Sequence, residues 1–258
     1  MERTVLITGA CINTGVAIVE KFAQEGYRVI FTGRDSQKVA HKEKEYQEKF
    51  PNVEILGYAM DSLLDERTVD EEAVKELFAD LDRRGIFVET LVLNAADQGL
   101  GQKIFENPLT DIQKVINTNV LWNYCLCEHA ALRMKEQGGG NIVFVNSNTA
   151  YRAIPDRVAY VTSKGAQLGM MRALTMDLGK YNIRVNAVLP GMIKTQRWVD
   201  NPDFYKNIPS RYTPIGDVAV GEDVADAVYY FAAHARNTTG AELVVDGGNT
   251  VQLYPIIP

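Results

Sequence analysis

Short runs rich in β-branched and aromatic residues alternate with longer runs of helical periodicity along the whole chain. This alternation is typical of a parallel sheet whose strands are joined by crossover helices. Strands are expected over residues 4–8, 28–32, 54–58, 90–93, 142–145, 184–188 and 242–245. Helices are expected over residues 16–25, 71–84, 110–136, 158–180 and 221–235. The pattern therefore predicts an α/β fold with one doubly wound, seven-stranded parallel sheet.

The length of the chain favours a single domain over residues 1–258. With 258 residues, 46% of them hydrophobic, the chain can build one large core but has little room for a separate substrate domain. The one long irregular stretch is expected at about residues 191–217. Loops of this length within compact domains are usually lids or binding loops, so we expect a substrate lid here.

Charge and cysteine content exclude several classes of function. A net charge of −6 argues against nucleic-acid and membrane partners, which favour basic patches. The three cysteines show neither metal-ligand spacing nor a disulfide framework, and no metal site is expected. No signal peptide or membrane-spanning stretch is recognised, so a cytoplasmic protein is expected.

Tyr160 and Lys164 are spaced for acid/base chemistry. Residues four apart share one face of a helix, which would bring the phenol and the ammonium together. A neighbouring cation favours the phenolate and lowers the pKa of the tyrosine. The same spacing also occurs by chance on solvated helix faces. Ser147 supports the catalytic interpretation, because it follows an expected buried strand, and strand ends are where ligands bind in such sheets.

A glycine-rich turn follows the first expected strand and opens the first expected helix, with the sequence Thr8-Gly9-Ala10-Cys11-Ile12-Asn13-Thr14-Gly15. Backbone N–H groups and the helix dipole at such a turn can hold a pyrophosphate. The alternative is a tight turn without a ligand.

With these motifs the chain resembles the short-chain dehydrogenase/reductase family, in its single-domain form of about 250 residues. Thr8, Gly9 and Gly15 match the glycine motif of the family, while Asn13 replaces its middle glycine, and asparagine tolerates the left-handed backbone better than most residues. Further matches lie in Asn94-Ala95-Ala96, Asp61, Pro190-Gly191, Thr195 and Asp246-Gly247-Gly248. The resemblance covers nearly the whole chain and implies a Rossmann fold that binds a nicotinamide dinucleotide.

The resemblance also implies the residues that bind the cofactor. They are Thr8, Gly9, Cys11, Asn13, Thr14, Gly15, Arg34, Asp61, Asn94, Ala95, Tyr160, Lys164, Pro190, Gly191, Ile193 and Thr195. Gly33 stands where NAD-preferring relatives carry an acid, and Arg34 suits a 2′-phosphate, so NADP(H) is favoured over NAD(H). Ile12, where a second basic residue is frequent, and the nearby Asp35 weaken this preference.

By resemblance, the catalytic set is Asn119, Ser147, Tyr160 and Lys164. Ser147 would donate a hydrogen bond to the substrate oxygen, and Tyr160 would supply the proton. Lys164 would lower the pKa of Tyr160 and bind the nicotinamide ribose. Asn119 would hold a water that relays protons toward Lys164.

The expected reaction is hydride transfer between NADP(H) and a ketone or secondary alcohol. The alternatives are a non-catalytic nucleotide-binding sensor on the same fold and an NAD-dependent sugar or polyol dehydrogenase. Sugar-nucleotide epimerases usually carry a larger C-terminal region, and enoyl reductases space the related tyrosine and lysine more widely.

Substrate and assembly are less constrained by the sequence. The expected substrate contacts are Ser147, Tyr151, Tyr160, Met192, Trp198 and Tyr205, although lid aromatics can also pack only on one another. The apolar tail, residues 252–258, could pack on a second subunit or over its own pocket. The resemblance implies a homo-oligomer, a dimer or tetramer, with interfaces on the helices that begin near Thr110 and Val158.

Overall fold

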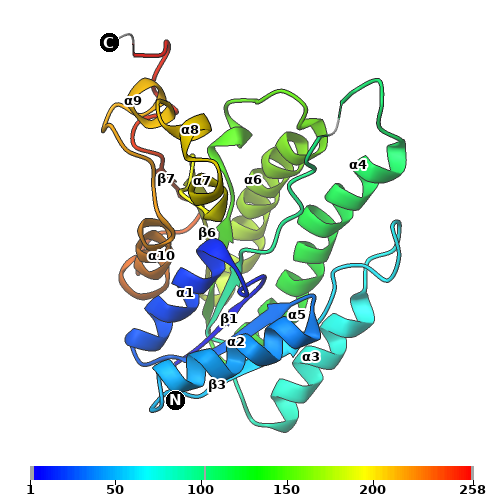
Figure 1. The fold of residues 1–258 in the computed structure, drawn as a ribbon. Coiled ribbons are helices and arrows are strands. Elements are labelled where there is room, and N and C mark those ends of the chain that lie inside the picture. Colours follow the sequence, from blue (N-terminus) through cyan, green and yellow to red (C-terminus); the bar gives the residue numbers. More distant parts are fainter. Residues whose placement is uncertain (1–2, 102, 257–258) are drawn as a thin grey trace.

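The computed structural model describes residues 3–101 and 103–256, which form a seven-stranded parallel sheet covered by helices on both faces (Figure 1). The strand order is β3-β2-β1-β4-β5-β6-β7. The strands are β1 (Thr4–Ile7), β2 (Arg28–Gly33), β3 (Ile55–Ala59), β4 (Thr90–Leu93), β5 (Gly140–Val145), β6 (Ile183–Pro190) and β7 (Glu242–Val245). The predicted doubly wound sheet is confirmed, and all seven expected strands are present.

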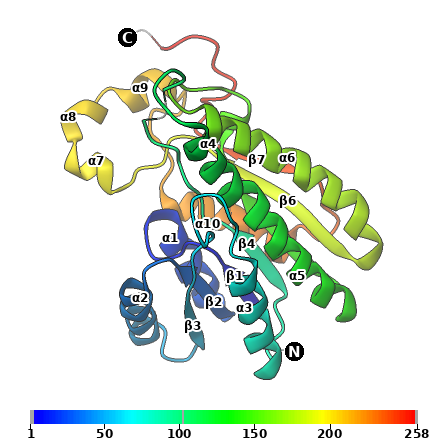
Figure 2. The same ribbon diagram turned by 90° about the vertical axis from the view of Figure 1, so that its right-hand side faces the viewer.

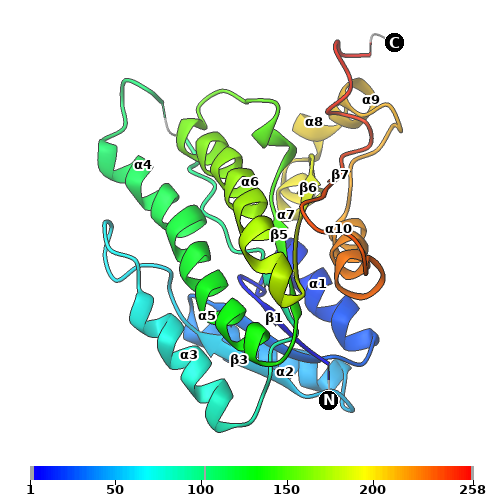
Figure 3. The same cartoon turned by 180° about the vertical axis from the view of Figure 1, so that it is seen from behind.

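Two layers of helices enclose the sheet. The main helices are α1 (Asn13–Gln24), α2 (Ser36–Lys49), α3 (Glu71–Arg83), α4 (Leu109–Ile116), α5 (Trp122–Glu136), α6 (Val158–Leu178) and α10 (Gly221–Tyr229). Helices α3, α5 and α6 pack on one face, and α1, α2 and α10 on the other. Figure 3 shows α5 and α6 side by side on their face.

The sheet has one hydrophobic core on each face, and the alternating direction of the side chains along each strand explains both. Neighbouring side chains of a strand point to opposite faces, so Leu6 joins the α3/α5/α6 core while Val5 and Ile7 join the other. All three side chains are fully buried. A strand of a parallel sheet must be apolar on both faces, which is why these runs read as continuous hydrophobic segments.

The expected helix over residues 110–136 is interrupted by a π-helical turn, η1 (Asn117–Leu121), between α4 and α5. A π turn inserts one extra residue into the helix and is frequent at functional sites. It reorients Asn117 and Asn119, whose side chains are buried. A second π turn, η4 (Tyr230–His234), follows α10, and the 3₁₀ turn η3 (Gly179–Tyr181) follows α6.

The 191–217 segment is more ordered than the sequence predicts. It contains α7 (Gln196–Asp200), α8 (Pro202–Tyr205) and α9 (Ile208–Tyr212). Figure 2 shows these helices at the same end of the molecule as the C-terminal segment. The expectation of one irregular loop is therefore wrong in detail, because Pro202 and Pro209 near two helix starts divide it into short helical turns.

The strand order reverses between β1 and β4. From β1 the sheet continues through β2 to β3, and from β4 it continues the other way through β5 and β6 to β7. In open α/β sheets, ligands bind at this reversal, outside the carboxyl ends of the strands. All paired strands are parallel, so the segments after β1, β4, β5 and β6 meet at one edge. None of the helices in residues 3–101 and 103–256 is both long and apolar enough to cross a bilayer.

Candidate active site

The glycine-rich turn is closely packed against the end of β4. Gly9 has a φ of +67°, and a Cβ on it would lie 2.8 Å from Cα of Ala95. A Cβ on Gly15 would lie 2.5 Å from the carbonyl oxygen of Gly9. Asn13 has a φ of +49°, so this asparagine adopts the left-handed backbone that glycine otherwise favours. The turn therefore keeps its compact shape despite the substitution.

Thr8 and Asn94 fasten this turn to the fourth strand. The hydroxyl of Thr8 accepts hydrogen bonds from the backbone N–H groups of Asn94 and Ala95, both at 3.0 Å. The amide of Asn94 donates to the carbonyl oxygens of Thr8 and Gly9, also at 3.0 Å. These contacts show Thr8 and Asn94 as residues that shape the turn.

A cavity of ≈ 370 Å³ opens beside the turn, at the start of α2. Its lining consists of Cys11, Asp35, Gln37, Lys38, His41 and Lys42. A Cβ on Gly33 would lie 2.5 Å from Sγ of Cys11, so a larger residue at the end of β2 would displace the cysteine. The carboxylate of Asp35 caps α2, where Oδ1 accepts from the N–H groups of Gln37 and Lys38, each at 3.0 Å.

Tyr160 and Ser147 meet at the carboxyl edge of the sheet. Burial raises the pKa of Tyr160, while a hydrogen bond with Ser147 and the charge of Arg157 act in the opposite direction. Ser147 follows β5 and is nearly buried, and its hydroxyl also accepts from the N–H of Thr149 at 3.2 Å. The pair thus forms a protected hydroxyl site in which Tyr160 remains protonated at neutral pH.

Lys164 is held against β5. Its ammonium donates to the carbonyl oxygen of Val145 at 3.0 Å and to Oε1 of Gln167 at 3.2 Å. The nitrogen lies 5.6 Å from the centre of the Tyr160 ring. Burial lowers the pKa of Lys164 to about 7. The arrangement departs from the sequence expectation in one respect, because the net shift of the Tyr160 pKa is upward.

Asn119 is fully engaged with neighbouring groups. Its Oδ1 accepts from the N–H of Asp97, and its Nδ2 donates to the Asp97 carbonyl, both at 2.8 Å. Nδ2 also donates to Oγ of Ser163 at 2.9 Å. The side chain therefore anchors the segment after β4 to α6, and the main-chain carbonyl of Asn119 accepts from Gln167 and Asn123.

The remaining residues expected to bind the cofactor lie around the same edge. A Cβ on Gly191 would lie 2.5 Å from Cβ of Asp246, which explains the glycine after Pro190. Ile193 pairs with Ala219 in an isolated bridge, and Thr195 precedes α7. Asp61 accepts from the N–H of Ser62 at 2.7 Å and is exposed after β3.

The aromatic residues of the 191–217 segment pack mainly on one another. Trp198 stacks on Tyr205 with ring centres 4.4 Å apart, and Phe204 meets Tyr205 edge-on at 4.9 Å. Met192 is half-buried, whereas Tyr151 is 52% exposed on the turn after Ser147. The expected substrate residues thus fall into two groups, one around Ser147 and one on the short helices.

The C-terminal segment lies on its own chain. The Gln252 amide and the Ile256 N–H donate to the carbonyl of Arg211 in α9, and Arg152 donates to the carbonyl of Gln252 at 2.7 Å. Ile257 and Pro258 lie outside the described residues. Leu253 and Tyr254 remain exposed.

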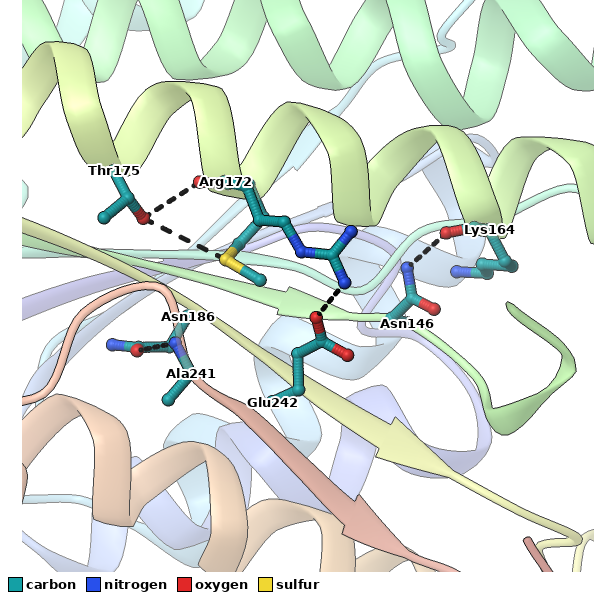
Figure 4. A network of polar contacts seen from close by, with 8 residues as sticks. Asn146, Lys164, Arg172, Thr175, Asn186, Ala241 and Glu242 are labelled. Carbon is teal, nitrogen blue, oxygen red and sulfur yellow. Dashed lines mark hydrogen bonds and ion pairs between the residues drawn. The ribbon is translucent and has the colours of Figure 1, made fainter. Parts of the chain in front are cut away.

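Two buried amides near Lys164 were not identified from the sequence. Asn146 donates to the carbonyl of Lys164 at 3.0 Å (Figure 4). Gln167 lies three residues beyond the lysine on α6. The signal was present, because a polar residue three positions after Lys164 on the same helix must share its buried face. Figure 4 also shows Arg172 of α6 paired with Glu242 of β7 at 2.6 Å, and Asn186 bound to the N–H of Ala241. Asn186 therefore joins β6 to the start of β7.

Comparison with known proteins agrees with this geometry. A family model described as Enoyl-(Acyl carrier protein) reductase matches residues 9–250. A 3alpha-hydroxysteroid dehydrogenase of Mediterraneibacter gnavus is 31% identical over 95% of this chain and 96% of its own. An NADP-dependent (R)-specific alcohol dehydrogenase of Lentilactobacillus kefiri is 30% identical over 97% of each chain. The structure of L-sorbose reductase from Gluconobacter frateurii, complexed with NADPH and L-sorbose, superimposes with a TM-score of 0.88 at 25% identity, covering 98% of both chains.

The chain belongs to the short-chain dehydrogenase/reductase family. Its Rossmann fold and the named activities of its relatives define it as an oxidoreductase that acts on CH–OH and C=O groups.

Proposed function

We propose that the protein is an NADP(H)-dependent reductase of ketones, with Tyr160 as the proton donor. The observation that carries the proposal is the joint placement of Tyr160, Ser147 and Lys164 at the carboxyl edge of the sheet, beside the closely packed glycine turn. When bound there, the nicotinamide supplies the hydride.

The glycine turn fits a dinucleotide. A Cβ on Gly9 or Gly15 would collide with Ala95 or with the Gly9 carbonyl, so the glycines keep the turn compact, and α1 begins within it at Asn13. Such a helix start attracts phosphate because its N–H groups and dipole point outward. Gly9, Asn13, Thr14 and Gly15 would hold the pyrophosphate, while Asn94, Pro190, Gly191, Ile193 and Thr195 would border the nicotinamide.

The cavity beside Gly33 supports a preference for NADP(H). Lys38 and Lys42 line it, and Arg34 follows Gly33 at its margin. Asp35 also lines the cavity, and its carboxylate caps α2, so its negative charge opposes a 2′-phosphate there. Lys38 would supply the second positive charge that Ile12 does not provide, whereas Lys42 is paired with Glu45 at 2.8 Å.

The pKa directions leave Tyr160, in the protein without ligands, in the protonation state that carbonyl reduction needs. Burial keeps Tyr160 protonated, which is the form that donates a proton to a developing alkoxide. Ser147 would donate a hydrogen bond to the same oxygen, and Lys164 would bind the nicotinamide ribose. Oxidation of an alcohol runs the same steps backward and needs Tyr160 as the phenolate.

The experiment that tests this proposal is a substrate screen that follows NADPH absorbance near pH 7 and is repeated with NADH. The panel includes a steroid ketone, a ketose, a small diketone and an enoyl thioester. We expect carbonyl reduction with NADPH to exceed that with NADH. Binding of NADPH without turnover across the panel would instead favour the nucleotide sensor, and preferential reduction of the C=C bond would favour an enoyl reductase.

A homo-oligomer is proposed as the functional form. Helices α5 and α6 present the exposed apolar side chains of Tyr124, Leu132 and Met176. Gly165 and Gly169 of α6 have open space around them within the described part of the chain, so a neighbouring helix could approach closely.

A further inference from the structure

Gln167 connects two members of the proposed catalytic set. Its Nε2 donates to the main-chain carbonyl of Asn119 at 2.7 Å, and its Oε1 accepts from Nζ of Lys164 at 3.2 Å. The residue is 1% exposed. The buried amide of Gln167 therefore connects the Asn119 carbonyl in η1 with the ammonium of Lys164. The family resemblance implies a water for this connection.

The orientation of this amide is fixed by its neighbours. Asn146 donates to Oε1 of Gln167 at 3.1 Å, while Oδ1 of Asn146 accepts from the N–H of Ser147 at 2.7 Å. Rotating the Gln167 amide would direct its NH₂ group at two other donors, Asn146 and Lys164. The oxygen must therefore face Lys164.

We propose that Gln167 is a positioning residue whose neutral acceptor holds the ammonium of Lys164 and thereby sets the proton equilibrium of the Lys164–Tyr160 pair. The Nε2 atom of Gln167 binds the carbonyl of Asn119 in η1, and this hydrogen bond keeps Oε1 beside the ammonium of Lys164. The consequence for turnover rests on the proposed function, whereas the effect on Lys164 does not.

Groups from β5, from the turn after it and from α6 surround Lys164. They are the Val145 carbonyl, the side chains of Asn146 and Gln167 and the Tyr160 ring, while Arg157 acts on Tyr160 through its charge. Within this set Gln167 is the side chain that directly accepts from the ammonium. Replacing it changes the stabilisation of the cation without adding or removing another titratable partner, except where the replacement is itself acidic.

Two substitutions are expected to move Lys164 in opposite directions. Gln167→Leu removes an acceptor from a buried cation, so its pKa falls by about one pH unit. Gln167→Glu is nearly isosteric and places an anion beside the cation, so the pKa rises. The sign reversal between two variants of similar size is not expected of a residue that only fills space.

The experiment titrates Lys164 directly in protein free of substrate and cofactor, by NMR of ¹³Cε-labelled lysine assigned with Lys164→Met. Asn123→Leu is the matched control, because Asn123 donates to the same Asn119 carbonyl at 2.9 Å and makes no contact with Nζ of Lys164. We expect a downward shift in Gln167→Leu, an upward shift in Gln167→Glu and none in Asn123→Leu.

Shifts of the same sign in both Gln167 variants, or none, would overturn the proposal. If Gln167→Leu does not fold, the direction of the Lys164 pKa shift in Gln167→Glu tests the proposal, and an upward shift is expected. A second readout is the pH profile of kcat/KM for carbonyl reduction, whose basic limb moves to lower pH in Gln167→Leu. If the protein shows no turnover, the proposed function is contradicted. The Lys164 titration would still test the role of Gln167, because it needs no turnover.

Discussion

At the scale of single residues, burial governs the chemistry of Tyr160 and Lys164. Both groups are shifted toward their neutral forms, the tyrosine upward and the lysine downward to about 7. The sequence spacing predicted that the two would interact, and the lysine does lie beside the tyrosine ring. It could not predict the depth of burial or the acceptors on β5, because both depend on packing between distant elements.

Lys164 should make stability depend on pH. Its pKa is lowered in the folded state, so the unfolded chain binds more protons between pH 7 and about 10.4, and the free energy of unfolding rises over this range. Lys164→Met removes the buried charge and should stabilise the cofactor-free protein by about 3 kcal/mol at pH 7. The gain should shrink toward pH 10, as measured by denaturant unfolding.

The control for this prediction is Lys44→Met on the exposed face of α2, which should leave the unfolding free energy within about 0.5 kcal/mol at each pH. A gain of equal size at pH 7 and pH 10 in Lys164→Met would show that the lysine is not the source of the pH dependence.

Arg34 should contribute to the choice of cofactor. Loss of a charge-assisted contact with a 2′-phosphate should weaken NADPH binding by about 10- to 100-fold in Arg34→Ala, and NADH binding much less. Fluorescence titration of both nucleotides measures the two affinities. Equal losses for both would remove Arg34 from the specificity site.

At the scale of elements, the sequence predicted regular periodicity well and local interruptions poorly. All seven strands follow from their apolar runs, but the expected helix over residues 110–136 divides at η1. Helix α2 is absent from the helices expected from the sequence. Its segment from His41 to Glu45 is rich in charge, and only Val39 and Tyr46 are buried on it. Its start is nevertheless encoded in the cap formed by Asp35. A π turn has no comparable signal, since it depends on where buried side chains such as Asn119 find partners.

The short helices of the 191–217 segment should affect binding of the substrate rather than binding of the cofactor. The Trp198–Tyr205 stack holds α7 against α8, and such aromatic pairs contribute about 0.5–1.5 kcal/mol beyond their buried area. Trp198→Leu should raise KM for the carbonyl substrate about 3- to 10-fold. The Kd for NADPH should stay within twofold.

The exposed Phe204 offers the comparison for this stack. It is 74% exposed and meets Tyr205 only edge-on, so Phe204→Leu should change KM less than Trp198→Leu does. Steady-state kinetics with one carbonyl substrate compares the two variants. A larger effect on NADPH affinity than on KM would assign the segment to the cofactor instead.

At the scale of the whole molecule, the sheet places residues from across the sequence at one edge. Thr8, Asn94, Ser147 and Gly191 follow four different strands and are brought together because the strands are parallel. This part of the site could be predicted once the strands were recognised. The cavity beside Cys11 could not, because it arises from contacts between a helix and a turn. The place of Gln167 on the face of Lys164 was predictable from its spacing, but its partners were not, because the Asn119 carbonyl and Asn146 lie on other elements.

The assembly should be sensitive to α6. A Cβ on Gly169 meets open space within the described residues, so we expect the isolated subunit to accept Gly169→Glu. The substitution should lower the sedimentation coefficient of an oligomer built on this face. The control is Lys44→Glu on the exposed face of α2, which introduces the same side chain away from α6 and should preserve assembly. An unchanged oligomer in Gly169→Glu would place the interface elsewhere.

The central claim is that Tyr160 donates the proton while the fold holds the cofactor independently of it. The most direct test compares turnover and NADPH binding in Tyr160→Phe, which removes only the hydroxyl. We predict a fall in kcat of at least about 10²-fold with the Kd for NADPH changed less than threefold. Turnover within a few-fold of the unsubstituted protein would contradict the account.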